Sequence, residues 1–307
     1  MQQFGCTVSP RVPAEPQALR YGHRVAKTKN LFAALKRRGP HRVLRGDLAF
    51  AGLPGVVYTP ESGLNLPGVA FGHDWLAGVA RYSATLEHLA SWGIVAAAPD
   101  TENGVAPSVL NLAYDLGTTI DIITGVRLGP GKISVHPNKL GLVGHGFGGS
   151  AAVFAAAGLN SSGSKPKAVA ALFPSVSKPA AEEPAAGLKI PGLILCAPGH
   201  EMTLQSNAAE LAAAWPGATL RTVAKARTGG LIEGFRLGRV VGLPGADKAT
   251  QKTVRALLTG YLLHVLTGDK TYRDFADAET LLPKTLAAAE GAEAPSIEDK
   301  VVALLKG

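Results

Sequence analysis

The chain has 307 residues, of which 46% are apolar and 18% are charged, so it can bury a substantial core within one large domain or two ordinary ones. Its two cysteines, Cys6 and Cys196, lie far apart, which excludes a disulfide framework and favours a reducing compartment. No apolar run reaches the ~20 residues that a membrane-spanning helix needs.

The net charge of +8 is concentrated at the N-terminus. Residues 1–50 hold 10 Lys and Arg but only two acidic residues, Glu15 and Asp47, which leaves 21 residues of each sign in the rest of the chain. Because a neutral body does not attract nucleic acid, no nucleic-acid partner is expected. A membrane surface or a protein would make electrostatic contact through residues 20–45.

The N-terminal arm, residues 1–42, begins with an irregular stretch over 1–25 and continues as a short basic helix over 26–38. Leu31, Phe32 and Leu35 share one face of this helix, which either packs on the body or docks on a membrane or a partner. The arm lacks the apolar stretch of a secretory signal, so we expect a cytoplasmic protein, with peripheral membrane attachment as an option. Its Arg-rich, acid-poor start also resembles an organelle transit peptide.

From Val43 to residue 276, strand and helix patterns alternate. The central strands are continuous apolar runs, which is typical of a mostly parallel sheet covered by helices on both faces, so the fold class is α/β. Strands are predicted at 47–50, 55–58, 68–71, 94–98, 140–143, 169–173, 192–196 and 220–223, and helices near 80–92, 107–125, 149–158, 203–214 and 247–267. Residues 178–187 read as a loop. Residues 277–307 form a C-terminal extension with a helix over 297–306.

The segment Leu142–Gly149 has the setting of a nucleophile elbow. In the G-x-S-x-G elbow, a strand leads directly into a helix, and the middle residue attacks the substrate carbonyl. Here the middle residue is Gly146, between Gly144-His145 and Phe147-Gly148. The architecture of an esterase is retained without the atom that performs the chemistry.

Residues 40–276 resemble the α/β-hydrolase superfamily, in particular its dienelactone-hydrolase and actinobacterial cutinase-like polyesterase branch. The resemblance rests on motifs that occur in the family's order: Val56–Pro60, Val69–Asp74, His88–Val95 with Ala98–Thr101, Lys139–His145 and Leu258–Phe275. It implies an α/β-hydrolase fold with an eight-stranded sheet. It also implies an oxyanion loop at 69–74 and a Ser–Asp–His triad in that chain order.

All three triad positions depart from that pattern. The family's nucleophile falls on Gly146, its Asp on His200 and its His near Thr228. The resemblance therefore predicts a catalytically degenerate homologue, a pseudo-esterase. Such a protein would bind a lipid, ester or carboxylate ligand, or a protein partner, through the former active-site cleft.

The oxyanion loop and the elbow supply the predicted ligand contacts. The backbone N–H groups of His73 and Phe147 are the expected oxyanion donors, and Trp75 is expected to form an apolar wall. The full set of predicted ligand-binding residues is Gly72, His73, Trp75, His145, Gly146 and Phe147.

The alternative is a true ester or lactone hydrolase with a rebuilt, non-triad site. Its acid–base groups would be His73, Asp74, His200 and Glu201, without a covalent intermediate. No ligand spacing supports a metal site, and no cofactor is expected.

Overall fold

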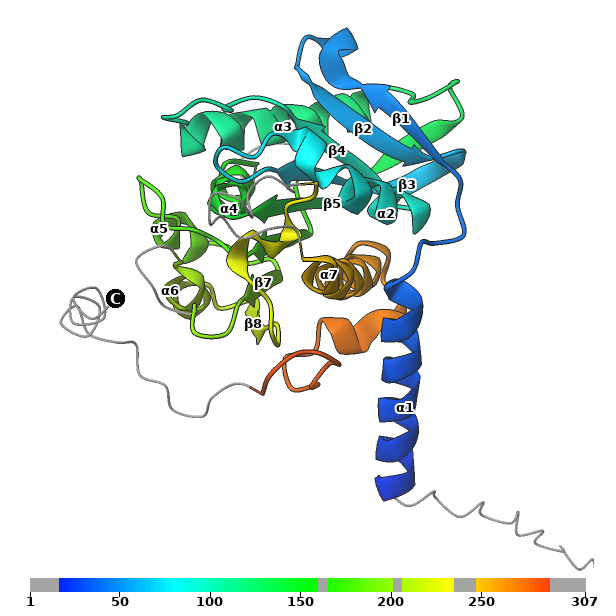
Figure 1. Ribbon diagram of the computed structural model, residues 1–307. Coiled ribbons are helices and arrows are strands. Elements are labelled where there is room, and N and C mark those ends of the chain that lie inside the picture. Colours follow the sequence, from blue (N-terminus) through cyan, green and yellow to red (C-terminus); the bar gives the residue numbers. More distant parts are fainter. Residues whose placement is uncertain (1–16, 160–164, 201–205, 235–246, 288–307) are drawn as a thin grey trace, which may run out of the picture.

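A computed structural model describes residues 17–159, 165–200, 206–234 and 247–287, and it contains an eight-stranded, mostly parallel sheet (Figure 1). The strand order is β1-β2-β4-β3-β5-β6-β7-β8. Strand β2 pairs antiparallel with both of its neighbours, and every other pairing from β4 to β8 is parallel. The bounds are β1 (Val43–Asp47), β2 (Gly55–Pro60), β3 (Gly63–Gly72), β4 (Val95–Pro99), β5 (Ile133–His145), β6 (Ala168–Leu172), β7 (Gly192–Cys196) and β8 (Ala218–Thr222).

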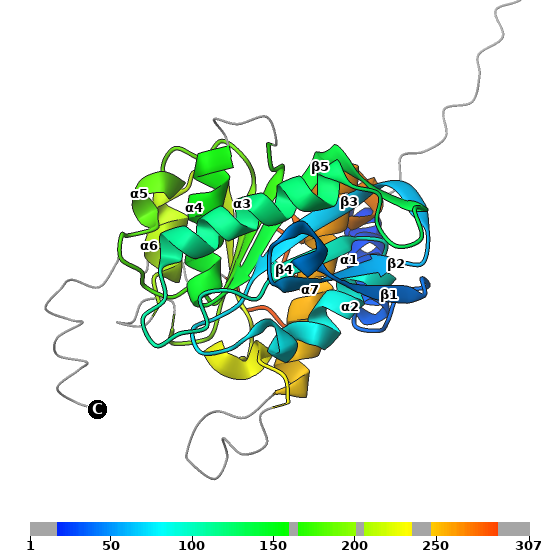
Figure 2. The same ribbon diagram turned by 90° about the horizontal axis from the view of Figure 1, so that it is seen from above.

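Helices cover both faces of the sheet, which confirms the predicted α/β class (Figure 2). One face carries α3 (Val109–Gly125), α4 (Phe147–Leu159), α5 (Glu182–Ala185) and α6 (Ala208–Ala214). The opposite face carries α2 (Ser83–Ser91) and α7 (Lys248–Thr267), and α1 (Gln17–Leu35) packs on α7.

The two faces form two separate hydrophobic cores. Successive residues of the central strands enter opposite cores, so Val69 and Phe71 pack under α2 and α7 while Ala70 packs under α3 and α4. This alternation follows from the two-residue period of a strand. It explains why the central strands read as unbroken apolar runs, since neither face of the sheet meets water.

Several predicted boundaries were wrong. The first strand is Val43–Asp47, and the predicted strand at 47–50 is instead η1 (Leu48–Ala51), a 3-10 turn in which the Asp47 carboxylate accepts the backbone N–H of Ala49. The N-terminal helix begins at Gln17, within the stretch predicted to be irregular, and the predicted loop at 178–187 contains α5. The helix predicted at 297–306 lies outside the described residues.

The last turns of α1 are anchored to the body. Phe32 and Leu35 are buried in the same core as α7, and the Thr28 hydroxyl donates a 2.5 Å hydrogen bond to the carboxylate of Asp274 in η5 (Lys270–Phe275). Residues 28–35 therefore pack on the body, which is one of the two alternatives predicted for this helix. No helix in the described ranges is long and apolar enough to cross a membrane.

Residues 277–287 continue the body on the side of β8. The buried guanidinium of Arg221 in β8 donates to the carbonyls of Asp277 and Thr280, and Thr285 bridges to Val223. Burial lowers the pKa of Arg221 to about 10, which leaves this anchor charged at neutral pH.

Candidate functional site

A cavity of about 550 Å³ lies beyond the carboxyl ends of the central strands. Ligand sites in open α/β sheets form at this edge, and volumes of 300–1,000 Å³ are typical of small-molecule pockets. The turn at Gly146, the loop after β3 and the loops after β4, β6, β7 and β8 contribute its described lining. The lining residues are Asp74, Trp75, Val105, Pro107, His145, Gly146, Phe147, Phe173, Pro174, Ser175, Val176, Ser206, Thr228 and Gly229.

The turn at Gly146 has the geometry of an elbow. Strand β5 ends at His145, helix α4 begins at Phe147, and the single residue between them has φ +53°, a left-handed conformation that is costly for a residue with a Cβ. A Cβ on Gly144 would lie 1.9 Å from the Gly148 carbonyl oxygen, and one on Gly148 would lie 2.3 Å from the Gly72 backbone. These glycines therefore allow α4 to pack directly against β3 and β5.

The carboxylate of Asp74 occupies the space next to the elbow into which a side chain at position 146 would project. A Cβ built on Gly146 would lie 2.0 Å from Oδ1 of Asp74 and 2.3 Å from its Cγ. Oδ1 accepts hydrogen bonds from the backbone N–H groups of Phe147, at 2.9 Å, and of Trp75, at 2.8 Å. Asp74 thus caps the N-terminus of α4, a position that favours negative charge.

Behind the carboxylate lies a buried hydrogen-bond chain through His145. Its Nε2 donates to the Thr228 carbonyl at 2.8 Å, and its Nδ1 accepts from the Tyr82 hydroxyl at 2.9 Å. The Tyr82 oxygen in turn accepts the backbone N–H of Asp74 at 3.1 Å. Burial is the main reason that the pKa of Tyr82 is raised well above its usual value, so the phenol keeps the proton that it donates to His145.

The predicted site residues divide into two groups. Trp75, His145, Gly146 and Phe147 line the cavity, and so does Thr228, where the resemblance predicts a catalytic histidine. Asp74, predicted only for the alternative acid–base site, is also there.

The other predicted residues lie elsewhere. Gly72 and His73 are not among the lining residues, and the ring nitrogens of buried His73 face the carbonyls of Asp74, at 2.9 Å, and Thr101, at 2.7 Å. His73 therefore ties the loop after β3 to the loop after β4. His200 is exposed and does not line the cavity, and Glu201 lies outside the described residues.

Sequence reasoning missed most of the lining that follows β4, β6, β7 and β8. The missed lining residues are Val105, Pro107, Phe173, Pro174, Ser175, Val176, Ser206 and Gly229. Their position in the sequence could have identified them, because the loops that follow central parallel strands lie at the ligand-binding edge of the sheet. Phe173 also has φ +50°, a strained conformation for an aromatic residue and one that clusters at functional sites.

The described lining shows no side chain that projects from the turn at Gly146, and the Phe147 N–H, which the resemblance predicts as an oxyanion donor, is taken by Asp74. His200 and Thr228 stand where the resemblance predicts a catalytic acid and a catalytic histidine. Within the described ranges, no group of three His, Cys, Asp or Glu side chains could hold a metal ion.

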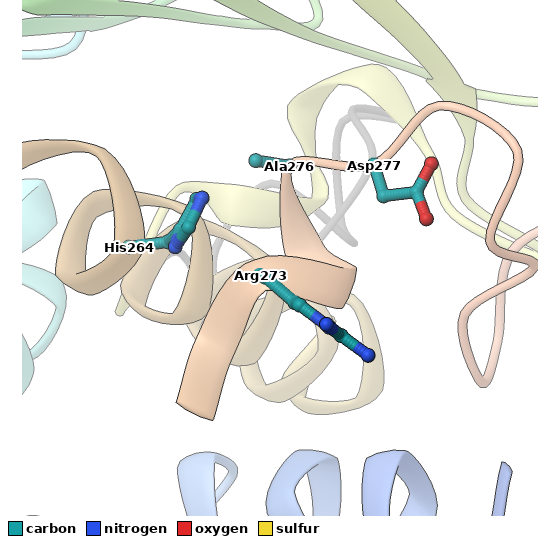
Figure 3. Close-up of a pocket in the computed structure, with 4 residues that line it drawn as sticks. All are labelled: His264, Arg273, Ala276 and Asp277. Carbon is teal, nitrogen blue, oxygen red and sulfur yellow. The ribbon is translucent and has the colours of Figure 1, made fainter. Parts of the chain in front are cut away.

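A second, smaller cavity of about 380 Å³ lies at the end of α7 beside η5 and is lined by His264, Arg273, Ala276 and Asp277. The side chains do not converge on a common point, because the Asp277 carboxylate and the Arg273 side chain both point away from His264 (Figure 3). The Arg273 side chain is 61% exposed and its Nε lies 3.6 Å from Asp274. These groups are arranged as a solvated surface rather than as a reaction site.

Comparison with known proteins adds no assignment, because no protein-family model and no curated protein sequence matches this chain.

Proposed function

We propose that the protein is a catalytically degenerate homologue of the α/β hydrolases that binds a small, largely apolar ligand of the ester or lipid class. The support for the family is the α/β fold together with the strand–glycine–helix turn at Gly146 and its close-packed glycines. The support for binding is a ligand-sized cavity at the edge of the sheet where α/β proteins hold their ligands.

The main support for the proposed loss of catalysis is the position of the Asp74 carboxylate. It fills the space that a nucleophile at position 146 would need, and it takes the Phe147 N–H that would stabilise an oxyanion. A carboxylate is a weak nucleophile towards esters at neutral pH, and His145, the histidine of the described lining, has both ring nitrogens engaged in hydrogen bonds with Tyr82 and Thr228. The cavity is therefore arranged to hold a ligand rather than to cleave it.

The walls of the cavity favour an apolar ligand. Trp75, Val105 and Val176 line it with large exposed surfaces, at 52%, 83% and 52% of their full exposure. Exposed apolar side chains grouped around a cavity are typical of a ligand-binding mouth. A carboxylate ligand is the least favoured of the predicted classes, because Asp74 already occupies the helix terminus that would attract it.

The test is a titration with neutral esters, such as hexyl butyrate, followed by Trp fluorescence and by calorimetry. Trp75 lies in the cavity wall, so we expect a saturable change in emission and a 1:1 stoichiometry. Val176→Arg should weaken binding at least tenfold by placing a charge in the apolar wall, whereas Leu64→Arg should leave it unchanged. Leu64 is a matched control because it is 58% exposed and lies at the opposite edge of the sheet, at the start of β3.

The same preparations should be assayed for hydrolysis of p-nitrophenyl butyrate. We expect no difference in rate between the wild type and Asp74→Asn, because neither protein has a nucleophile at the elbow. A wild-type rate that falls at least tenfold in Asp74→Asn would contradict the proposal and would support the ester or lactone hydrolase with a rebuilt site.

A further inference from the structure

Asp74 gives the cavity a negative charge that no Lys or Arg of the described lining balances. Oδ1 of the carboxylate holds two backbone N–H groups, whereas the described residues provide no hydrogen bond to Oδ2. The Asp74 side chain is 26% exposed, and it belongs to the cavity lining, so Oδ2 is open to a ligand. A partly buried carboxylate favours a bound partner that supplies hydrogen-bond donors and positive charge.

No other described lining residue neutralises this charge. The described lining includes no Lys or Arg. The nearest basic group is His145, whose Nδ1 lies 3.9 Å from Oδ2. Both ring nitrogens of His145 are already engaged, with the Tyr82 hydroxyl and the Thr228 carbonyl.

The walls next to the carboxylate are aromatic. Trp75 follows Asp74 directly, Phe147 provides the N–H that Asp74 accepts, and Phe173 lines the same cavity. Aromatic faces attract organic cations through the ring quadrupole, most strongly where water is excluded. A carboxylate with aromatic neighbours in a cavity of about 550 Å³ therefore combines the two features that recognise an alkylammonium group.

We propose that the polar end of the ligand is an organic cation, an ammonium group on an apolar chain, bound with its N–H donors against Oδ2 of Asp74. The apolar chain extends along Val105 and Val176 towards the mouth of the cavity. This inference rests on the proposed binding function and names the class of head group that the cavity selects. The Asp74 carboxylate, which fills the space beside Gly146, would then be the group that recognises the ammonium.

The test compares three ligands with the same chain length, octylammonium, 1-octanol and octanoate, by calorimetry at pH 7 and low salt. We expect octylammonium to bind at least about tenfold more tightly than octanol, and octanoate to bind most weakly. In Asp74→Asn the preference for the ammonium should vanish, while octanol binding stays within about twofold. Asn keeps an oxygen that can cap α4, and an unfolding curve checks that the variant is folded.

The control variant is Glu61→Gln, which removes the same charge at the opposite edge of the sheet, where Glu61 precedes β3 and lies 3.7 Å from Arg42. It should leave all three affinities unchanged. Equal affinities of octylammonium and octanol in the wild type, or an ammonium preference that persists in Asp74→Asn, would overturn the inference while leaving the binding function intact. If none of the three ligands and no neutral ester binds, both proposals fail.

Discussion

At the scale of single residues, Gly146 and Asp74 depend on each other. Glycine adopts the left-handed backbone of the elbow at little cost, and its missing Cβ leaves the volume that the Asp74 carboxylate fills. The carboxylate in turn satisfies the Phe147 N–H at the start of α4, which a buried helix end must pair with some acceptor. The absence of a side chain at position 146 is therefore a structural requirement of the present arrangement.

This dependence has a consequence for attempts to restore catalysis. A serine at position 146 would place its Cβ against Oδ1 of Asp74, so the carboxylate would have to rotate away and release the Phe147 N–H. A nucleophile introduced at position 146 alone would thus disturb the cap of α4, and Thr228 would still stand where the resemblance predicts a catalytic histidine. Any regained hydrolase activity requires changes at several positions.

At the scale of secondary-structure elements, one carboxylate joins three segments beside the cavity. Glu233 follows η3 (Thr228–Leu231), and its Oε1 and Oε2 accept the backbone N–H groups of Thr85 and Ala84 at the start of α2. Oε1 also accepts from Arg255 of α7 at 2.7 Å. Because η3 carries Thr228, whose carbonyl holds His145, this junction positions one wall of the cavity.

We expect Glu233→Gln to lower the free energy of unfolding by about 3 kcal/mol. Both partners of the Glu233–Arg255 pair are only 15% exposed, and removing one charge leaves the other without compensation. The check is urea unfolding beside Glu61→Gln, which breaks the Arg42–Glu61 pair, whose side chains are 85% and 54% exposed. That exposed pair should contribute less than about 1 kcal/mol, and equal small losses in the two variants would show that Glu233 is not a structural junction.

At the scale of the whole molecule, acid pH should destabilise the fold through His88. This residue of α2 is 7% exposed, its Nε2 has no hydrogen-bond partner among the described residues, and burial together with Arg255 lowers its pKa to about 4. An unfolded histidine titrates near 6.5. The neutral buried ring therefore contributes its full stability above about pH 6.5, and this contribution is lost as the pH falls towards 4.

The measurement is the free energy of unfolding at pH 7.5 and pH 4.5 in the wild type and in His88→Leu. Leucine does not titrate, so we expect the loss between the two pH values to be smaller in the variant by about 2 kcal/mol. His41→Leu is the control, because His41 is exposed and should leave the pH dependence unchanged. The same pH dependence in the wild type and His88→Leu would contradict this role of His88.

The α/β class and most strands and helices could be predicted from the sequence, because buried strands such as Val95–Pro99 are continuous apolar runs between helical patterns. Strand β1 was missed because it lies at the edge of the sheet, where three of its five residues are exposed and the apolar pattern is weak. The start of α1 was missed because residues 1–25 show little apolar periodicity.

The candidate site was only partly predictable for a different reason. Gly146 and Thr228 could be identified by alignment with the order of a known motif, since each is fixed by its place after a strand. The position of the Asp74 carboxylate depends on a rotamer and on a contact with α4, 73 residues further along the chain, and no sequence pattern reports such a contact. The contacts of the His73 ring could not be predicted either. Its two carbonyl partners are visible only in the fold, so the sequence placed His73 in the ligand site.

The most direct test of the central claim, that the Asp74 carboxylate occupies the space that a side chain at position 146 would need, is a double-mutant cycle of unfolding free energies for Gly146→Ala and Asp74→Ala. In the wild-type background, Gly146→Ala should cost both the backbone strain and the hydrogen bonds of the displaced carboxylate. In the Asp74→Ala background it should cost only the strain, so we expect the penalty to be smaller by at least about 1 kcal/mol. Penalties that agree within about 0.5 kcal/mol would mean that the two residues are independent and would contradict the claim.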